Sequence, residues 1–152
     1  MREIAILLPY KENFSENSAG AASIWVKDYL NKSSLKSRST VYGYLSDKSK
    51  PLLKNFKNLK LGNSFVKKNI SYTDMLYKEY LKYNFKIIEI HNRPESLLYL
   101  IKKKVKSKLI FIYHNNPQDL RSSSSINERI FIAENTDQIY FVSNWVKNKF
   151  FE

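Results

Sequence analysis

Short apolar runs alternate along the chain with stretches of helical period. Residues 4–8 are continuously apolar and end at Pro9, which is typical of a strand buried on both faces of a parallel sheet. Comparable runs predict further strands at residues 40–45, 86–90, 109–113 and 139–142. A short strand is also expected near residues 59–61, within a lysine-rich segment, residues 46–69, that otherwise shows no clear period.

Helical periodicity fills the intervals between these runs. The first helix opens at residues 20–22 and ends near Asn31. The next helix begins at Ser71, whose hydroxyl is expected to cap the first turn while Asp74 completes a capping-box-like pattern. Three more helices are expected to begin near Pro94, Ile126 and Asn144.

The alternation of strands and helices predicts an α/β fold, a Rossmann-like doubly wound parallel sheet with helices on both faces. We expect residues 1–152 to form a single domain, because the sequence has no internal repeat, no low-complexity tract and no linker.

Composition narrows the chemistry of the chain. It has no cysteine and only two histidines, which excludes disulfides and thiolate metal sites and argues against a histidine metal site, so we expect no metal and no cofactor. No apolar run reaches the roughly 18 residues that cross a membrane. No secretory leader precedes the first strand, and we expect a cytoplasmic protein.

The net charge of +12 suggests two further classes of binding partner, nucleic acids and anionic membranes. A basic nucleic-acid-binding protein is one alternative, but 21 of the 26 basic residues are lysines, and base recognition depends on arginine forks, so we expect no nucleic acid. An anionic membrane surface stays open as a peripheral partner, since each lysine near it contributes about 1 kcal/mol. The lysine-rich stretches at residues 48–68 and 102–108 would make that contact.

A free-standing flavodoxin-like or response-regulator-like ligand-binding module is the other alternative. It requires a phosphate loop or clustered acidic residues after the first strand, and the sequence shows neither clearly.

Polar residues gather where predicted strands end, which is the edge at which parallel sheets bind ligands. The residues that precede the strands are ordinary surface types. A histidine, two asparagines and a glutamine within five residues supply many hydrogen-bonding groups for a hydroxyl-rich ligand. The candidate site residues at this edge are Gly20, Ala21, His91, Asn92, Arg93, His114, Asn115, Asn116, Gln118, Arg121 and Ser143.

Each candidate also has a purely structural interpretation. Gly20 could serve close helix packing, and His91 could cap the helix that follows it. Arg93 and Glu95 could form a surface ion pair of little energetic value. The segment 114–116 could be an ordinary polar turn.

Four segments taken in order resemble the N-terminal domain of the retaining GT-B glycosyltransferases called group 1, or family 4. They are residues 18–26, 89–94, 114–121 and 141–146. The resemblance covers essentially the whole chain and is most specific at its His-Asn-Arg-Pro and His-Asn-Asn-Pro segments. It implies two Rossmann-like domains that face each other across a cleft. The enzyme would transfer a sugar from a nucleotide-sugar donor to a glycan or lipid-linked acceptor, in cell-surface polysaccharide or lipopolysaccharide synthesis, without a metal.

The resemblance also implies roles for individual residues. His114 matches a histidine near the reaction centre that contacts the transferred sugar. Gly20, with Ala21, matches a loop that approaches the donor phosphates, although the family often has paired glycines where this chain has Ser-Ala-Gly. The residues that it places on the acceptor side or at the border of the cleft are His91, Arg93 and Arg121.

The family's donor-binding basic residue and paired glutamates would lie beyond residue 152. The sequence ends inside a predicted helix, at Phe151 and Glu152. We therefore expect this chain to be the acceptor-side half alone, without the donor-binding domain and inactive in sugar transfer by itself.

Overall fold

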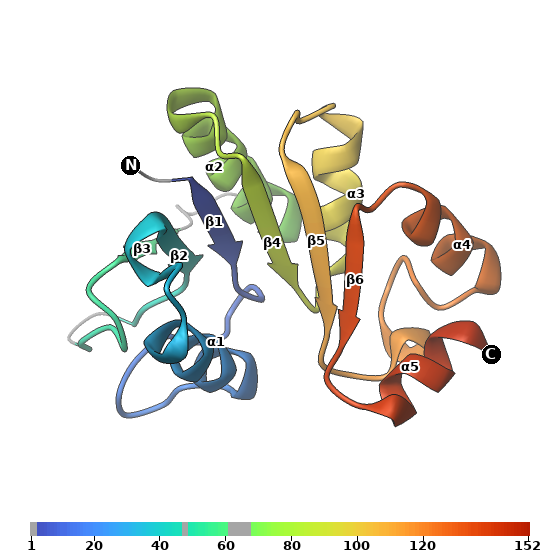
Figure 1. Cartoon of the computed structure of the whole chain (residues 1–152), viewed down its shortest axis with the longest axis horizontal. Coiled ribbons are helices and arrows are strands. Elements are labelled where there is room, and N and C mark those ends of the chain that lie inside the picture. The colour runs from blue at the N-terminus through green and yellow to red at the C-terminus, as the bar shows by residue number, and fades with distance from the viewer. Residues whose placement is uncertain (1–2, 47–48, 61–67) are drawn as a thin grey trace.

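A computed structural model describes residues 3–46, 49–60 and 68–152 (Figure 1). Within these ranges, six parallel strands form one sheet. The strands are β1 (Ile4–Leu7), β2 (Ser39–Gly43), β3 (Phe56–Asn58), β4 (Ile87–His91), β5 (Lys108–Tyr113) and β6 (Gln138–Phe141). The helices are α1 (Ala21–Lys32), α2 (Lys68–Tyr83), α3 (Pro94–Lys102), α4 (Ile126–Glu134) and α5 (Asn144–Phe151), with short 3-10 turns η1 (Lys36–Arg38) and η2 (Pro117–Asp119). The predicted Rossmann-like α/β fold is confirmed.

The strand order is β3-β2-β1-β4-β5-β6. The chain steps outward from β1 to β3, returns through α2 to place β4 beside β1, and then steps outward on the other side. The direction of winding therefore reverses between β1 and β4, and such a reversal leaves a crevice outside the carboxyl ends of the two strands. A flavodoxin-like sheet has the order 2-1-3-4-5, so this topology counts against the flavodoxin-like alternative.

Apolar side chains fill both faces of the sheet. Ile88 and Ile90 belong to the larger cluster, which lies against α2, α3 and α5. On the opposite face, α1 buries Ala22, Val26 and Leu30 against β1 and β2. These three residues recur every four positions, which places them on one stripe of the helix. Side chains alternate along each strand, so each strand contributes to both layers.

The Ser71 helix start is wrong, because α2 begins at Lys68 and Ser71 lies inside the helix. The predicted cap does not form, because the carboxylate of Asp74 has other partners. This carboxylate accepts a hydrogen bond from the Tyr99 hydroxyl at 2.5 Å and pairs with Lys78 at 3.1 Å.

The third strand in chain order also differs from the expectation. It occupies Phe56–Asn58, just upstream of the predicted 59–61, and residue 61 lies outside the described residues. Part of the lysine-rich stretch 48–68 likewise lies outside them.

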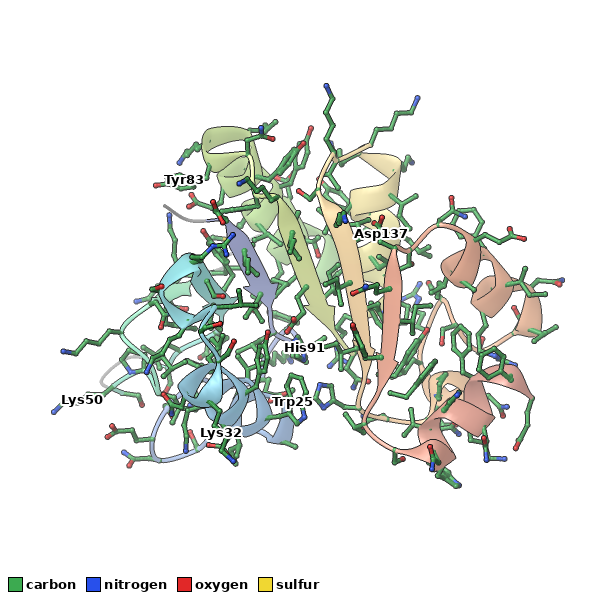
Figure 2. The ribbon with its side chains drawn as sticks, in the orientation of Figure 1. Trp25, Lys32, Lys50, Tyr83, His91 and Asp137 are labelled. Atoms are coloured by element: carbon green, nitrogen blue, oxygen red, sulfur yellow. The ribbon has the colours of Figure 1, made fainter. Side chains whose placement is uncertain are left out.

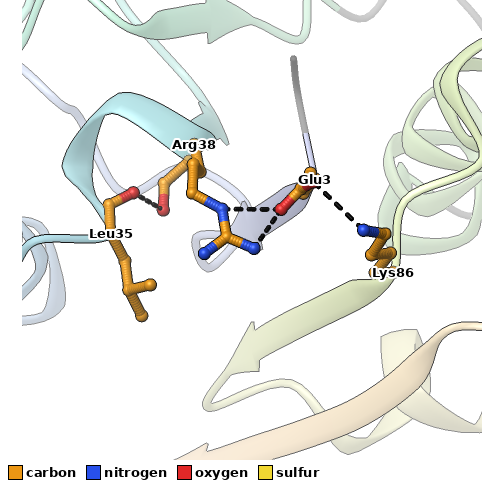
Figure 3. Close-up of polar contacts among 5 residues, drawn as sticks. Glu3, Leu35, Arg38 and Lys86 are labelled. Atoms are coloured by element: carbon orange, nitrogen blue, oxygen red, sulfur yellow. Dashed lines mark hydrogen bonds and ion pairs between the residues drawn. The ribbon is translucent and has the colours of Figure 1, made fainter.

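An ionic cluster ties the amino-terminal end of the sheet together (Figure 3). The Glu3 carboxylate accepts hydrogen bonds from the Arg38 guanidinium and, at 3.1 Å, from the Lys86 ammonium. These hydrogen bonds, that from Arg38 foremost, hold the pKa of Glu3 below its usual value. Segments before β1, β2 and β4 are thereby joined at the end of the sheet remote from the candidate site.

Candidate functional site

Both histidines of the chain meet at the carboxyl ends of β4 and β5. His91 is the last residue of β4, and His114 directly follows β5. The Nδ1 of His91 lies 2.8 Å from the Nε2 of His114, and the ring centroids are 5.1 Å apart. Figure 2 shows His91 beside Trp25, between α1 and the strand ends, with Asp137 and Tyr83 toward the other end of the sheet.

A buried carboxylate completes the pair. Glu89 precedes His91 by two residues on β4, so both side chains point to the same face of the sheet. The Oε1 of Glu89 lies 2.7 Å from the Nε2 of His91. Glu89 is 7% exposed and His91 is fully buried. The arrangement is a linear chain of hydrogen bonds, Glu89 to His91 to His114.

Trp25 closes the site from the α1 side. Its ring meets His91 edge-on at 5.6 Å and His114 at 5.8 Å between centroids. One turn further along α1, Tyr29 is half-buried and stacks on Trp25. Burial, with the nearby negative charge of Glu89, raises the pKa of Tyr29. Aromatic rings thus cover the histidine pair, while Trp25 keeps 39% of its surface exposed to solvent.

Burial changes the protonation of His114. Desolvation, followed by repulsion from His91, lowers the pKa of His114 to about 4. The imidazole of His114 is therefore neutral near pH 7, when it can both donate and accept a hydrogen bond.

Asn92 fixes the backbone that carries His114. Its φ of 52° lies in the left-handed region, which asparagine tolerates better than most residues. Its backbone N–H donates to the Ile112 carbonyl at 2.9 Å. Its side-chain oxygen accepts hydrogen bonds from the backbone N–H groups of His114 and Asn115, both at 3.2 Å. The two strand ends are therefore held together beside the histidine pair.

A separate hollow of about 360 Å³ gathers Asn92, Arg93 and Arg121. The other residues that line it are Tyr10, Lys11, Pro94, Glu95, Asp119 and Leu120. The guanidinium of Arg93 donates to the Asn92 carbonyl at 3.0 Å. Among the described residues, it has no ion pair with Glu95. Three of the predicted cleft residues thus share one pocket, and the histidine pair lies outside its lining.

The other predicted cleft residues have bonds within the fold. The Asn116 side-chain oxygen accepts from the Gln118 backbone N–H at 3.1 Å, and the Gln118 amide donates to the Lys149 carbonyl at 3.0 Å. The Ser143 hydroxyl accepts from the Val146 N–H at the start of α5. Asn115 is exposed. The 114–116 segment is therefore a structured turn whose outer side chains still face solvent.

At the start of α1, a carboxylate occupies the helix N-terminus. The Oε1 of Glu12 accepts from the backbone N–H of Ser23 at 2.6 Å. Gly20 precedes the helix with ordinary backbone angles, and a Cβ added there would lie 2.5 Å from the Glu12 side chain. Ala21 beside it is exposed. A donor phosphate that approached Gly20 and Ala21 would therefore meet the Glu12 carboxylate first.

Sequence reasoning missed Glu89, Trp25 and Glu12. Glu89 could have been identified from the sequence, since a carboxylate inside an apolar strand requires a partner, and His91 is the nearest polar residue on the same strand face. His91 does not cap α3, because Arg93 occupies that position and makes no side-chain cap. The cap interpretation of His91 is wrong.

The structure of this chain is similar to that of a sucrose-phosphate synthase from Thermosynechococcus elongatus, with a TM-score of 0.59 and 16% sequence identity. The likeness covers 90% of this chain and 41% of that protein, so the chain spans less than half the length of its structural neighbour. It supports the Rossmann-like fold. No protein-family model matches the sequence. Sequence comparison with curated proteins gives no match.

Two negative findings concern the described residues alone. No group of three or more histidine, cysteine or acidic side chains there could hold a metal ion. None of the helices described is both long and apolar enough to cross a bilayer.

Two of the four described arginines are committed to the fold. Arg38 pairs with Glu3. Arg129 is buried, and its guanidinium donates to the carbonyls of Ser123, Ser124 and Phe150. Arginine forks on one open face, which the nucleic-acid alternative requires, are therefore not formed by these two residues.

Proposed function

We propose that this chain is the acceptor-side domain of a glycosyltransferase. The full enzyme would move a sugar from a nucleotide-sugar to a glycan or lipid-linked acceptor of a cell-surface polysaccharide or lipopolysaccharide. In the proposal no metal or other cofactor takes part, and the anomeric configuration is retained, as the family resemblance implies.

The observation that carries the proposal is the position of His114. Its neutral imidazole stands outside the carboxyl ends of β4 and β5, next to the point where the sheet reverses direction. A neutral ring with a donor and an acceptor suits a sugar hydroxyl. The Trp25 ring, which lies beside His114 and is 39% exposed, offers an apolar surface for the C–H groups of a sugar ring. The similarity to the fold of a sucrose-phosphate synthase supports the same class of reaction.

The pocket lined by Arg93 and Arg121 supplies the second part of the proposal. With Lys11, it brings three cationic side chains against two acidic ones, Glu95 and Asp119. In the proposal this pocket receives the part of the acceptor that carries acidic or phosphate groups, and His114 receives the hydroxyl that reacts. Arginine suits such groups because its planar fork can bind two oxygens at once.

Ligand binding to Trp25 tests this proposal directly. The chain has two tryptophans, so a Trp145→Phe variant reports Trp25 alone. Titration with a panel of uridine, guanosine and adenosine diphosphate sugars and of oligosaccharides should change Trp25 fluorescence, and His114→Ala should weaken that change. Flavin mononucleotide and short DNA duplexes serve as probes of the alternatives. A response to either of these with none to any sugar compound would overturn the proposal.

A further inference from the structure

We infer that Glu89, His91 and His114 form a proton relay, in which the Nδ1 of His114 takes the proton of a bound hydroxyl and the resulting positive charge settles on His91 beside Glu89. The inference rests on the proposed function for the identity of that hydroxyl, and on the hydrogen-bond geometry for everything else.

The hydrogen bonds fix the tautomers of both rings. The Glu89 carboxylate can only accept, so the Nε2 of His91 must donate to it across 2.7 Å. A neutral His91 then has no proton on Nδ1, which must accept from the Nε2 of His114 across 2.8 Å. A neutral His114 that donates from Nε2 has a bare Nδ1. Among the described residues no group hydrogen-bonds to that nitrogen, so it is the open end of the relay.

The location of the charge follows from burial and pairing. No carboxylate of the described residues pairs with His114, and burial together with His91 lowers the pKa of this ring to about 4. A positive charge on His91 lies directly against Glu89, and a charge-assisted hydrogen bond between them is stronger than a neutral one. A proton that enters at His114 is therefore more stable when its positive charge moves to His91.

The transfer step forms one bond at the anomeric carbon and breaks another. The hydroxyl oxygen of the acceptor bonds to the anomeric carbon, and the bond from that carbon to the donor phosphate breaks, with its electron pair leaving on the phosphate. The hydroxyl proton bonds to the Nδ1 of His114, and the Nε2 proton of His114 passes to the Nδ1 of His91. After product release the proton returns to water by the reverse path.

In the part of the chain that the structure describes, few other titratable groups face the relay. Tyr29 approaches from α1 and interacts with Glu89 and with Tyr140 of β6. Tyr140 pairs in register with Ile112, which in turn pairs with His91, so it lies two strands away on the same face. Both are phenols whose ordinary pKa is near 10. Glu89 is therefore the charged group whose hydrogen bond bears directly on the two rings.

Two-bond proton–nitrogen NMR correlation of the ¹⁵N-labelled chain tests the relay without any substrate. At neutral pH, both rings should be Nε2–H tautomers. On acidification, the first proton should make His91 the imidazolium, while His114 changes to the Nδ1–H tautomer and stays neutral. An Nδ1–H tautomer on either ring at neutral pH, or a first proton that settles on His114, would overturn the inference.

Glu89→Gln and Glu134→Gln form a matched pair of variants, the second on an exposed position at the end of α4. Glu89→Gln keeps the side-chain shape and removes the charge, so the midpoint of first proton uptake should fall by at least about one pH unit, a tenfold loss of proton affinity. Glu134→Gln should leave it unchanged. An unmoved midpoint in folded Glu89→Gln refutes the relay. If that variant does not fold, the ring tautomers of the wild-type chain test the relay instead. Because neither measurement uses a sugar, failure of the relay is distinguishable from failure of the proposed function.

Discussion

The side-chain oxygen of Asn92 lies 3.2 Å from the backbone nitrogen of His114, so the residue after β4 holds the residue after β5. The same oxygen also receives the N–H of Asn115. The position of the His114 ring is therefore set by a left-handed residue on a neighbouring strand.

Asn92→Ala should destabilise the chain by about 2–3 kcal/mol, because the left-handed backbone costs alanine about 1 kcal/mol and the lost hydrogen bonds add about 1 kcal/mol or more. Asn92→Asp keeps the acceptor oxygens and should cost less than about 1 kcal/mol. Urea unfolding measures both. Asn115→Ala, which removes an exposed side chain, is the control, and an equal loss in all three variants would refute this role for Asn92.

His114→Ala should lower turnover by roughly 10²-fold or more in a protein that joins this chain to the donor-binding domain that the proposed function implies, with less effect on donor affinity. The expected cause is loss of a positioned polar contact made mainly in the transition state. His91→Ala should lower turnover as well, through loss of the partner ring, and Lys103→Ala should leave it unchanged. Near-normal turnover in a folded His114→Ala protein would favour the polar-turn interpretation of residues 114–116.

Stability should fall on acidification because of His114. Its pKa in the folded chain is about 4, below the ordinary value of 6.5, so the unfolded chain binds this proton first as the pH drops. The stabilisation is complete above about pH 6.5 and is lost as the pH falls toward about 4. Relative to His114→Gln, the wild-type chain should lose about 1–2 kcal/mol of unfolding free energy between about pH 7 and about pH 4.5. Parallel stability curves for the two proteins would contradict this assignment.

Gly20→Ala should displace the Glu12 side chain from the start of α1, since the added Cβ would lie 2.5 Å from it. The lost cap should cost about 1 kcal/mol, and Glu12→Ala should cost about the same. Because both changes remove the same contact, the double variant should cost little more than either one. Fully additive losses in urea unfolding would show that Gly20 and Glu12 act separately.

Glu12→Ala should also expose the N–H groups of the first turn of α1 to anions. Inorganic phosphate or a nucleotide diphosphate should then bind more tightly to this variant than to the wild-type chain. Unchanged phosphate affinity, measured by calorimetry, would count against the donor-phosphate role predicted for Gly20 and Ala21.

Most of the fold could be predicted because each buried strand of a parallel sheet leaves a continuous apolar run, as at β1 and β5. The start of α2 could not be predicted from the Ser71–Asp74 pattern, since the Asp74 carboxylate accepts a hydrogen bond from Tyr99, which is 25 residues away. The edge of the sheet that holds the two histidines was also accessible, because strand direction alone decides it. The hydrogen bond between the two histidines could not be predicted, because it depends on side-chain geometry across two strands. The role of Glu12 could not be predicted either, because its partner, Ser23, belongs to the next helix.

Weak, salt-sensitive binding to anionic vesicles stays a prediction from the lysine stretches. Lys102 ends α3 and Lys108 begins β5, so the stretch 102–108 lies at the amino-terminal edge of the sheet, remote from the histidine pair. Replacing Lys104, Lys106 and Lys108 with glutamine should weaken vesicle sedimentation more than replacing the exposed Lys32, Lys36 and Lys147 does. Equal binding to neutral and anionic vesicles would refute the prediction.

The pairing of β1 with β4, which sets Ile6 opposite Glu89, carries a consequence for folding fidelity. A slip of one residue would turn every β4 side chain to the other face. Glu89 and His91 would then enter the apolar layer beneath α2 and α3, while Ile88 and Ile90 would face α1. A carboxylate buried there without its partners costs several kcal/mol. The same two polar residues that give β4 its chemistry, Glu89 and His91, therefore make its misaligned states unfavourable.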